Sequence, residues 1–478
     1  MAFIRPGIII AVAAIAIGCR APAAVAPLPS PGPTELPILS PVSGILTPTP
    51  PAATIPTPDS GTAPSAAGTP TPIYTGDLSA PCGVLLSPLP GIVATPASSP
   101  VGDAARASLR TAAPDAAWPA LQRLLDGPQT VGLVAYQVGR EGEGVYLNGD
   151  APMPLASVAK LITLVAYAEA VAAGELNPLE QVPLAELDRY YLPNFDLSAH
   201  RRAIDELTQN AEIISPDDNP AVQLEDVAAI MIRYSSNAAA DYLQFRLGQE
   251  RIEQTAIDLG LNDGPGSHSA PCTFLGQFLM MANHTRGVVN DRAILAALAD
   301  GDAADAQAYG REMGLLADAY INQPDFRTRE QEWRSANRRP LSDTQRYFTA
   351  RLAPQGTAGA YARLMQTLAQ NGLSSADSSF QARRILEWPN LFPANQEFFS
   401  NVGYKNGSLP GVLTTAYYAY RWGDGAAVVV VLFFRDLPQQ TYRQWRFDLP
   451  HDELARWLLT DPAAIPTLAA ALRAAPVP

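Results

Sequence analysis

The sequence predicts an α/β domain of the α+β type, with helices flanking one sheet and an all-helical subdomain inserted into it. Two observations predict this class. Strand-like apolar runs lie near both ends of the folded region, and helical patterns dominate the stretch between them. The chain has 478 residues, of which 47% are hydrophobic and 17% are charged. This balance is typical of a globular protein and excludes a disordered polyampholyte or a multi-span membrane protein.

The first elements form a helix, a hairpin and a second helix. A short amphipathic helix is indicated by the apolar spacing of Trp118, Leu121, Leu124 and Leu125. Residues 131–139 and 144–148 read as a pair of strands, and residues 155–173 as a helix rich in Ala, Leu and Val without internal proline.

The last elements are three strands and a helix. Residues 401–405, 412–422 and 426–435 are strand-like runs separated by Gly/Pro or Gly/Asp turns, and residues 452–459 read as the last helix. Since strands occur at both ends, we expect one sheet assembled from both ends of the chain.

The N-terminus has the pattern of an export signal. Residues 1–18 contain one positive charge, Arg5, and a short apolar run over 8–17 that suits a signal-peptide core. Small residues precede Cys19, as in bacterial lipoproteins whose cysteine is lipidated after cleavage. An ordinary signal peptide or an uncleaved anchor are the alternatives. Each predicts that the rest of the chain lies outside the cytoplasm, and we expect a lipid anchor on the extracytoplasmic face of a bacterial membrane.

A tether is predicted over residues 19–100. Residues 20–72 contain 15 prolines and only three charged residues, with Ala, Thr and Ser filling most of the remainder. Such a composition cannot bury enough apolar area to fold. The folded domain is expected over 115–465, with insertions near 186–215 and 286–350. The second insertion is a lid or, as we favour, a solvated excursion.

Two cysteines remain once Cys19 is assigned to lipid. Cys82 and Cys272 both occur in the tetrapeptide Ser-Ala-Pro-Cys. Outside the cytoplasm they could form a disulfide that pins the tether to the domain. Two unpaired thiols are the alternative.

The net charge and the spacing of the histidines argue against nucleic acid, metal ions and cofactors as ligands. The formal net charge is −13, which disfavours nucleic acid as a partner. The four histidines lack ligand spacing, so neither a metal site nor a cofactor is expected; they are His200, His268, His284 and His451.

The first chemical motif is Ser157-Val158-Ala159-Lys160. A serine and a lysine three positions apart on a helix share one face, so the amine can reach the hydroxyl. A serine needs such a base to become a nucleophile, and a buried lysine can supply it when its pKa is lowered. The chain has only two lysines, which makes a chance match rare.

The second motif is Ser235-Ser236-Asn237, which closes a helical stretch that begins at Leu224. A second hydroxyl can relay a proton to a leaving group, and an asparagine can orient a lysine and a substrate amide. Taken alone, these residues are equally typical of a helix cap.

The third motif, Lys405-Asn406-Gly407-Ser408, ends an apolar strand and contains the other lysine. A lysine here raises the local positive potential, Gly407 lets a substrate lie against the strand edge, and Ser408 offers a hydroxyl and a backbone N–H. A plain strand end with a turn is the alternative.

In this order the motifs resemble the Ser-x-x-Lys, Ser-Asp-Asn and Lys-Thr-Gly set of class A β-lactamases and penicillin-binding proteins. The resemblance covers roughly residues 115–465. It implies a mixed sheet with flanking helices and an all-helical subdomain.

The resemblance also implies a role for each matching residue. Ser157 would be the acylated nucleophile and Lys160 its base or proton relay. Ser235 would carry the proton to the leaving nitrogen, Asn237 would orient the substrate and Lys405 would be the electrostatic clamp. Asn406, Gly407 and Ser408 would bind substrate, and the backbone N–H groups of Ser157 and Ser408 would form the oxyanion hole.

Three departures accompany these matches. Ser236 stands where the family has aspartate, and Asn406 where it has threonine or serine. The Glu-x-x-Leu-Asn sequence that activates the deacylating water in class A enzymes does not occur between Asn237 and Lys405. Fast hydrolysis of an acyl-enzyme is therefore in question.

Three functions follow as hypotheses. The first is an active-site-serine hydrolase that opens β-lactams through an acyl-enzyme at Ser157. The second is a penicillin-binding D-alanyl-D-alanine carboxypeptidase acting on peptidoglycan stem peptides, which the missing glutamate favours. The third is a catalytically idle binding module, which would predict decayed motifs.

Overall fold

A five-stranded sheet with the strand order β2-β1-β9-β8-β7 organises the molecule. The computed structural model describes residues 101–193, 195–196, 198–215, 218–261, 273–285, 303–337, 345–346, 349 and 353–473. Its strands are β1 (Val131–Gln137), β2 (Val145–Leu147), β7 (Phe399–Leu409), β8 (Val412–Arg421) and β9 (Val428–Phe434). Two small sheets pair β3 (Met153–Pro154) with β6 (Gln355–Gly356) and β4 (Gln181–Pro183) with β5 (Ala221–Gln223).

The sheet joins both ends of the chain, as the sequence predicted. β1 pairs with β9 from Val131↔Phe434 to Gln137↔Val428, and β1 also pairs with β2. Every described strand pair is antiparallel, so the expected mixed sheet is an antiparallel one. The reason is that short connections join β1 to β2, β7 to β8 and β8 to β9, and such connections reverse the chain direction.

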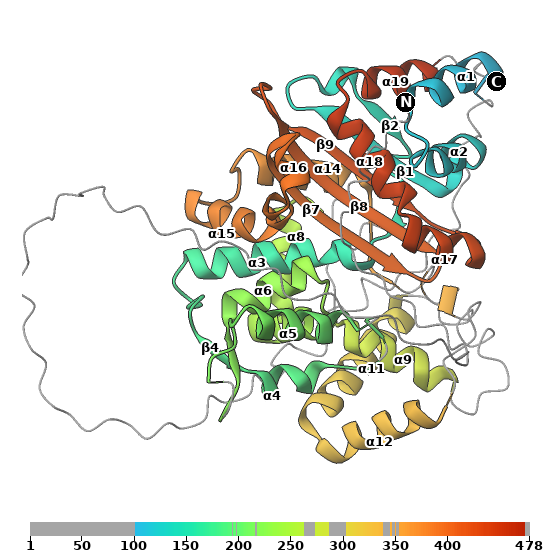
Figure 1. The fold of residues 1–478 in the computed structure, drawn as a ribbon. Helices are drawn as coiled ribbons and strands as arrows, with labels where there is room; N and C mark the ends of the chain where they lie inside the picture. Colours follow the sequence, from blue (N-terminus) through green and yellow to red (C-terminus); the bar gives the residue numbers. More distant parts are fainter. Residues whose placement is uncertain are drawn as a thin grey trace, which may run out of the picture. The chain divides into compact units, whose positions relative to one another are not determined.

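Helices cover both faces of the sheet (Figure 1). The terminal helices are α1 (Asp103–Ala112), α2 (Trp118–Asp126), α17 (Gln439–Asp448), α18 (Pro450–Thr460) and α19 (Ala464–Arg473). The helices between the two groups of strands are α3 (Lys160–Ala172), α4 (Leu184–Leu187), α5 (Ala199–Gln209), α6 (Leu224–Arg233), α7 (Asn237–Leu247), α8 (Gln249–Asp258), α9 (Phe274–Thr285), α11 (Ala303–Asn322), α12 (Pro324–Ala336), α14 (Ala358–Ala369), α15 (Ala376–Leu386) and α16 (Pro393–Gln396).

Side-chain alternation along β8 separates the two faces. Thr415 and Tyr417 donate hydrogen bonds to Asp452 of α18, at 3.0 and 3.4 Å. Thr414, one position away, donates to the carbonyl of Leu155 at 2.8 Å on the opposite face. Because successive side chains of a strand point to opposite faces, α18 covers one face and the start of the α3 region lies against the other.

Several elements differ from the sequence expectation. The helix expected over 155–173 begins with the 3₁₀ turn η4 (Ala156–Ala159), and only Lys160–Ala172 is α-helical. Three helices, α1, α17 and α19, were not predicted, so α18 is not the last helix as expected. The sequences of α1 and α17 carry a weak apolar signal: α1 buries only Leu109, and α17 only Tyr442 and Trp445.

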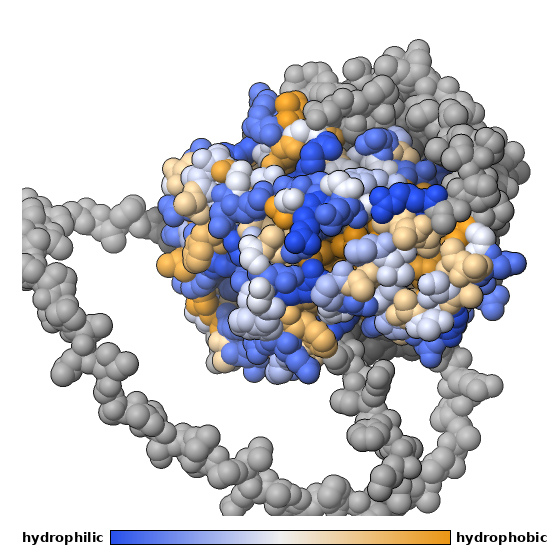
Figure 2. Space-filling view, turned by 90° about the horizontal axis from the view of Figure 1, so that it is seen from above, coloured by the Kyte–Doolittle hydropathy of each residue, from blue (hydrophilic) through white to orange (hydrophobic). Residues whose placement is uncertain are grey.

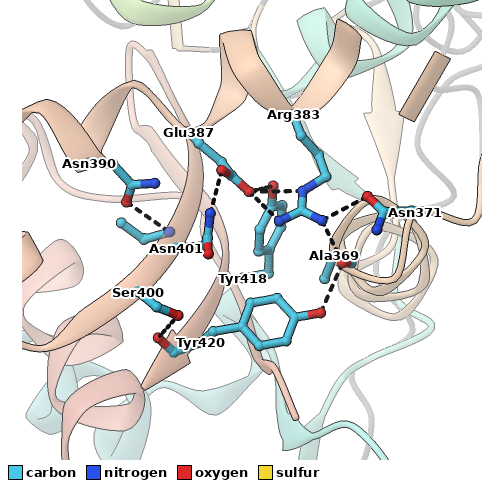
Figure 3. Close-up of polar contacts among 10 residues, drawn as sticks. Ala369, Asn371, Arg383, Glu387, Asn390, Ser400, Asn401, Tyr418 and Tyr420 are labelled. Carbon is cyan, nitrogen blue, oxygen red and sulfur yellow. Dashed lines mark hydrogen bonds and ion pairs between the residues drawn. The ribbon is translucent and has the colours of Figure 1, made fainter. Parts of the chain in front are cut away.

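A polar network fixes the start of β7 against α15 (Figure 3). The carboxylate of Glu387 accepts hydrogen bonds from Arg383 Nε at 2.8 Å, Tyr418 OH at 2.9 Å and Asn401 Nδ2 at 2.8 Å. The Tyr418 ring crosses β7 at Gly403, where a Cβ would lie 2.3 Å from it. Only glycine fits there, so the register of β7 under α15 is held by packing as well as by charge.

The surface intersperses hydrophilic and apolar residues in small groups on the face that Figure 2 shows. Large exposed apolar side chains include Leu391 and Trp422, at 66% and 63% exposure. No helix in the described part of the chain is both long and apolar enough to cross a membrane.

Candidate active site

Three segments of the chain bring the predicted motifs together. Ser157 lies in η4 and Lys160 begins α3, Ser235 and Asn237 lie at the junction of α6 and α7, and Lys405 lies on β7. Hydrogen bonds connect the three segments through the two lysines. The lysines are 0% and 1% exposed, so the meeting point is buried.

Lys160 is the centre of the arrangement. Its Nζ donates to Ser157 Oγ at 3.2 Å and to Ser235 Oγ at 3.4 Å. It also donates to the Ser235 carbonyl at 2.6 Å and to Asn237 Oδ1 at 2.7 Å. The amine therefore contacts both hydroxyls that the sequence predicted, those of Ser157 and Ser235. It also contacts the side-chain amide of Asn237.

Lys405 approaches Ser235 from the sheet. Its Nζ donates to Ser235 Oγ at 2.9 Å, to the Asn406 carbonyl at 2.7 Å and to Asn406 Oδ1 at 3.4 Å. Both amines thus converge on the hydroxyl of Ser235. A proton on that hydroxyl has a direct route to either lysine.

Burial changes the proton affinity of both lysines. It lowers the pKa of Lys160 to about 7, although the carboxylates of Asp241 and Asp196 oppose the shift. Burial, together with the neighbouring Lys160, holds the pKa of Lys405 well below its usual value. At least one neutral amine is therefore available near neutral pH, as a general base requires.

Two backbone positions beside the reactive groups are strained. Ala156, directly before Ser157, has φ 50°, and Ser235 has φ 64°. These left-handed conformations cost a non-glycine residue about 1 kcal/mol or more, and surrounding contacts must enforce them. Such strain is concentrated at functional sites.

β7 lies directly against the nucleophile segment at Gly407. A Cβ there would lie 2.5 Å from Thr414 Oγ1 and 2.6 Å from the backbone nitrogen of Ser157. The next residue, Ser408, shares a hydrogen bond with the Tyr442 hydroxyl of α17 at 2.9 Å between the oxygens. The third motif is therefore in place beside Ser157, with glycine where the approach requires it.

Sequence reasoning missed Phe274 and Asp241. The Phe274 ring lies over Lys160, 4.7 Å from ring centroid to Nζ. Asp241, which is 0% exposed, accepts the backbone N–H groups of Phe274 and Leu275 at 2.8 and 2.6 Å. It thereby fixes the first turn of α9 and the position of the ring. Burial raises the pKa of Asp241 to about 7.

The match to a known family decides what this constellation is. A family model described as the beta-lactamase enzyme family matches residues 117–446, well over half of the chain. The chain belongs to the β-lactamase enzyme family. This match confirms the resemblance that the three motifs indicated.

This member of the β-lactamase enzyme family is similar to several solved structures at low sequence identity. The β-lactamase from Sphaerobacter thermophilus DSM 20745 is 18% identical, with a TM-score of 0.41 over 70% of this chain and 93% of that one. The β-lactamase from Desulfarculus baarsii DSM 2075 is 16% identical, with a TM-score of 0.40 over 75% and 99%. PBP-A is 15% identical, with a TM-score of 0.37 over 71% and 96%. No curated protein matches the chain.

Some predictions fall outside the described residues. Cys19, Cys82 and Cys272 all lie there, so lipidation and the disulfide stay predictions. Among the described residues, no group of three or more His, Cys, Asp or Glu side chains could hold a metal ion.

Proposed function

We propose that this β-lactamase-family protein is an active-site-serine hydrolase that forms an acyl-enzyme at Ser157. The observation that carries the proposal is the position of Lys160 Nζ, within hydrogen-bond distance of both Ser157 Oγ and Ser235 Oγ. One amine can then take the proton of the nucleophile and pass it to the hydroxyl that serves the leaving group.

Acylation would proceed by proton transfer through this cluster. Ser157 Oγ attacks the carbonyl carbon of an amide while its proton moves to neutral Lys160. The carbon–nitrogen bond breaks as the nitrogen takes the Ser235 proton, which Lys160 replaces. Asn237 orients the substrate, and Lys405, whose Nζ donates to Ser235 Oγ, is the electrostatic clamp on the developing anion. The backbone N–H groups of Ser157 and Ser408 serve as the oxyanion hole.

The substrate we propose is a β-lactam or a related amide. Asn406, Gly407 and Ser408 lie along β7, the last strand in the order of the sheet, where an extended ligand has a strand to lie against. The signal and tether predicted from the sequence support a reaction outside the cytoplasm, on a lipid-anchored protein.

A D-alanyl-D-alanine carboxypeptidase acting on peptidoglycan is the second candidate, and Phe274 favours it. Deacylation requires a base beside the attacking water. Beside Lys160, where such a water could be activated, lies the aromatic ring of Phe274. This ring excludes water from one side of the amine, so an acyl-enzyme formed with a penicillin would persist.

Intact-mass spectrometry of the full chain with benzylpenicillin tests both candidates. A lasting adduct that Ser157→Ala abolishes supports a penicillin-binding peptidase. Penicilloate formation with a fleeting adduct supports a β-lactamase. Ser400→Ala is the matched control, since Ser400 lies on the same strand as Lys405 and is exposed.

Failure of both readouts has one meaning. If neither adduct nor product forms while the wild-type chain is folded, the hydrolase proposal is wrong. The idle binding module then becomes the better hypothesis.

A further inference from the structure

We infer that His200 is a positioning residue that holds the Ser235-Ser236-Asn237 segment through the side chain of Ser236. The inference rests on the proposed function. It also joins two features that the sequence left separate, the serine at position 236 and the segment 186–215 that carries α5.

The contact is short and wholly buried. His200 Nδ1 lies 3.0 Å from Ser236 Oγ, and the two residues are 1% and 0% exposed. Ser236 Oγ also accepts the backbone N–H of Ala239 at 3.1 Å, which makes Ser236 the N-cap of α7. One side chain therefore joins the start of α7 to α5.

The hydrogen bonds form a directed chain. Ser236 Oγ accepts from Ala239, so its own proton can go to His200 Nδ1. The other ring nitrogen, Nε2, lies 3.4 Å from Asp188 Oδ1 and donates there. This assignment places the ring proton on Nε2 and leaves Nδ1 as an acceptor.

Ser236, His200 and Asp188 do not form a catalytic triad with Ser236 as the nucleophile. Ser236 is 0% exposed and its oxygen already caps α7, so a substrate carbonyl cannot reach it. Ser236 therefore has a structural role, and the reactive hydroxyls are its neighbours in the site.

The position of this support matters because Ser235 is strained. Its φ of 64° is unfavourable for serine and persists only where surrounding contacts enforce it. Lys160 holds the peptide that follows Ser235 through the Ser235 carbonyl, at 2.6 Å. The hydrogen bond between Ser236 and His200 holds the residue at the other end of the same peptide. It thereby helps to keep the Ser235 carbonyl and Asn237 Oδ1 on Lys160 Nζ.

His200 is itself held rigidly by its own segment. Its backbone N–H donates to Asp196 Oδ2 at 2.8 Å at the start of α5. The Tyr191 ring packs against the imidazole, with 5.0 Å between ring centroids. The segment 186–215 thus brings a preorganised hydrogen-bonding side chain to Ser236. At this position the family pattern has an aspartate.

Acylation by benzylpenicillin provides the first test, with His200→Leu and His200→Asn in the full chain. Leucine fills the space without hydrogen bonding, whereas an asparagine amide can replace Nδ1. For His200→Leu we expect the acylation rate constant to fall by about 10- to 100-fold, with the dissociation constant of the initial complex changed by less than about threefold. His200→Asn is expected to recover most of the rate.

His451→Leu is the matched control. His451 is also buried, at 2% exposure, but it contacts Asp452 on the α18 side of the sheet. The His451→Leu variant should be less stable than the unsubstituted protein, but its folded form should be acylated at an unchanged rate. Equal rate losses in His200→Leu and His451→Leu would overturn the inference.

A second measurement does not depend on activity. Because the chain has only two lysines, a ¹³C-lysine sample gives two ε-methylene signals, and Lys405→Arg assigns them. His200→Leu should move the titration midpoint of Lys160 downward by about 0.5 pH unit or more, since the acceptors at Nζ that favour the ammonium form are loosened. A midpoint that stays within this margin overturns the inference.

The two measurements separate the inference from the proposed function. If wild-type protein is not acylated, the proposed hydrolase fails. A Lys160 midpoint that shifts in His200→Leu and returns in His200→Asn still supports positioning by His200.

Discussion

At the scale of single residues, the proposed acylation depends on the amine of Lys160, which is buried away from water. Lys160 contacts hydroxyl, carbonyl and amide oxygens, and a phenylalanine ring covers it. Burial makes its neutral form accessible, because water no longer stabilises the ammonium.

The first prediction concerns the pH dependence of acylation. Lys160 acts as a base only when neutral, so the acylation rate constant should rise as the pH increases through about 7, the pKa to which burial lowers it. Stopped-flow or quenched-mass measurements across this range check it. Lys160→Arg should be inactive at every pH, since guanidinium keeps its proton. A flat profile would exclude Lys160 as the base.

The second prediction concerns Phe274. Phe274→Ala removes the ring over Lys160 and admits water, so the penicillin adduct should decay faster, on the order of tenfold. Phe274→Leu keeps an apolar cover and should retain a long-lived adduct. The lifetime is measured by mass spectrometry after removal of free penicillin. Equal lifetimes in both variants would show that the ring does not control deacylation.

Sequence and structure agree unevenly at this scale. Ser157, Lys160 and Lys405 could be identified because both lysines of the chain fall in short motifs. Phe274 and His200 could not, because each reaches the site from another element and no local spacing records that contact. Asp241 lies on α7 with Asn237, but its hydrogen-bond partners are on the distant α9. A phenylalanine such as Phe274 is also common in ordinary cores.

At the scale of elements, the approach of β7 to η4 controls the geometry around Ser157. The two segments come together at Gly407, where there is no room for a side chain.

The third prediction tests this approach with Gly407→Ala. The new methyl group would meet Thr414 Oγ1 and the Ser157 backbone nitrogen at 2.5 and 2.6 Å, so β7 and η4 must move apart. We expect acylation to fall by about 100-fold and stability by about 1–3 kcal/mol. Gly142→Ala is the control, because a Cβ there meets nothing within 4 Å. Unchanged acylation in Gly407→Ala would contradict the proposed contact.

The elements that sequence patterns predicted well are those with a strong apolar signal. β9 is buried along its whole length, and its unbroken run of Val, Leu and Phe predicts a buried strand. The polar helix α17 has no such run, yet it delivers Tyr442 to Ser408. The 3₁₀ turn at Ser157 was missed because Ala and Val continue the helical pattern of α3 without a local break.

At the scale of the whole molecule, the buried lysines couple stability to pH. Folding places Lys160 and Lys405 where the charged form is disfavoured, whereas in the unfolded chain each has the usual lysine pKa of 10.5. Between about pH 7 and 10 the unfolded state therefore binds more protons than the folded state.

The fourth prediction is the sign of this dependence. The free energy of unfolding should rise with pH between about 7.5 and 9.5, by up to about 1.4 kcal/mol per pH unit for one proton. Urea denaturation at several pH values checks it. Lys160→Met should reduce the slope, while substitution of an exposed arginine such as Arg443→Met should not. An equal slope in Lys160→Met and in the unsubstituted chain would show that Lys160 does not cause this dependence.

The pairing of β1 with β9 also has a consequence for biosynthesis. Val131 meets its partner Phe434 only after nearly the whole domain has been made. Such non-local pairing gives a high contact order, so a nascent chain cannot close the central sheet until its last strands emerge. Any truncation before residue 428 removes β9, the strand that joins β1 to β8. The segment that carries Ser157 and Lys160 then has no complete sheet to pack against. A protein built in this way completes its candidate active site only once the last strands of the sheet have been synthesised.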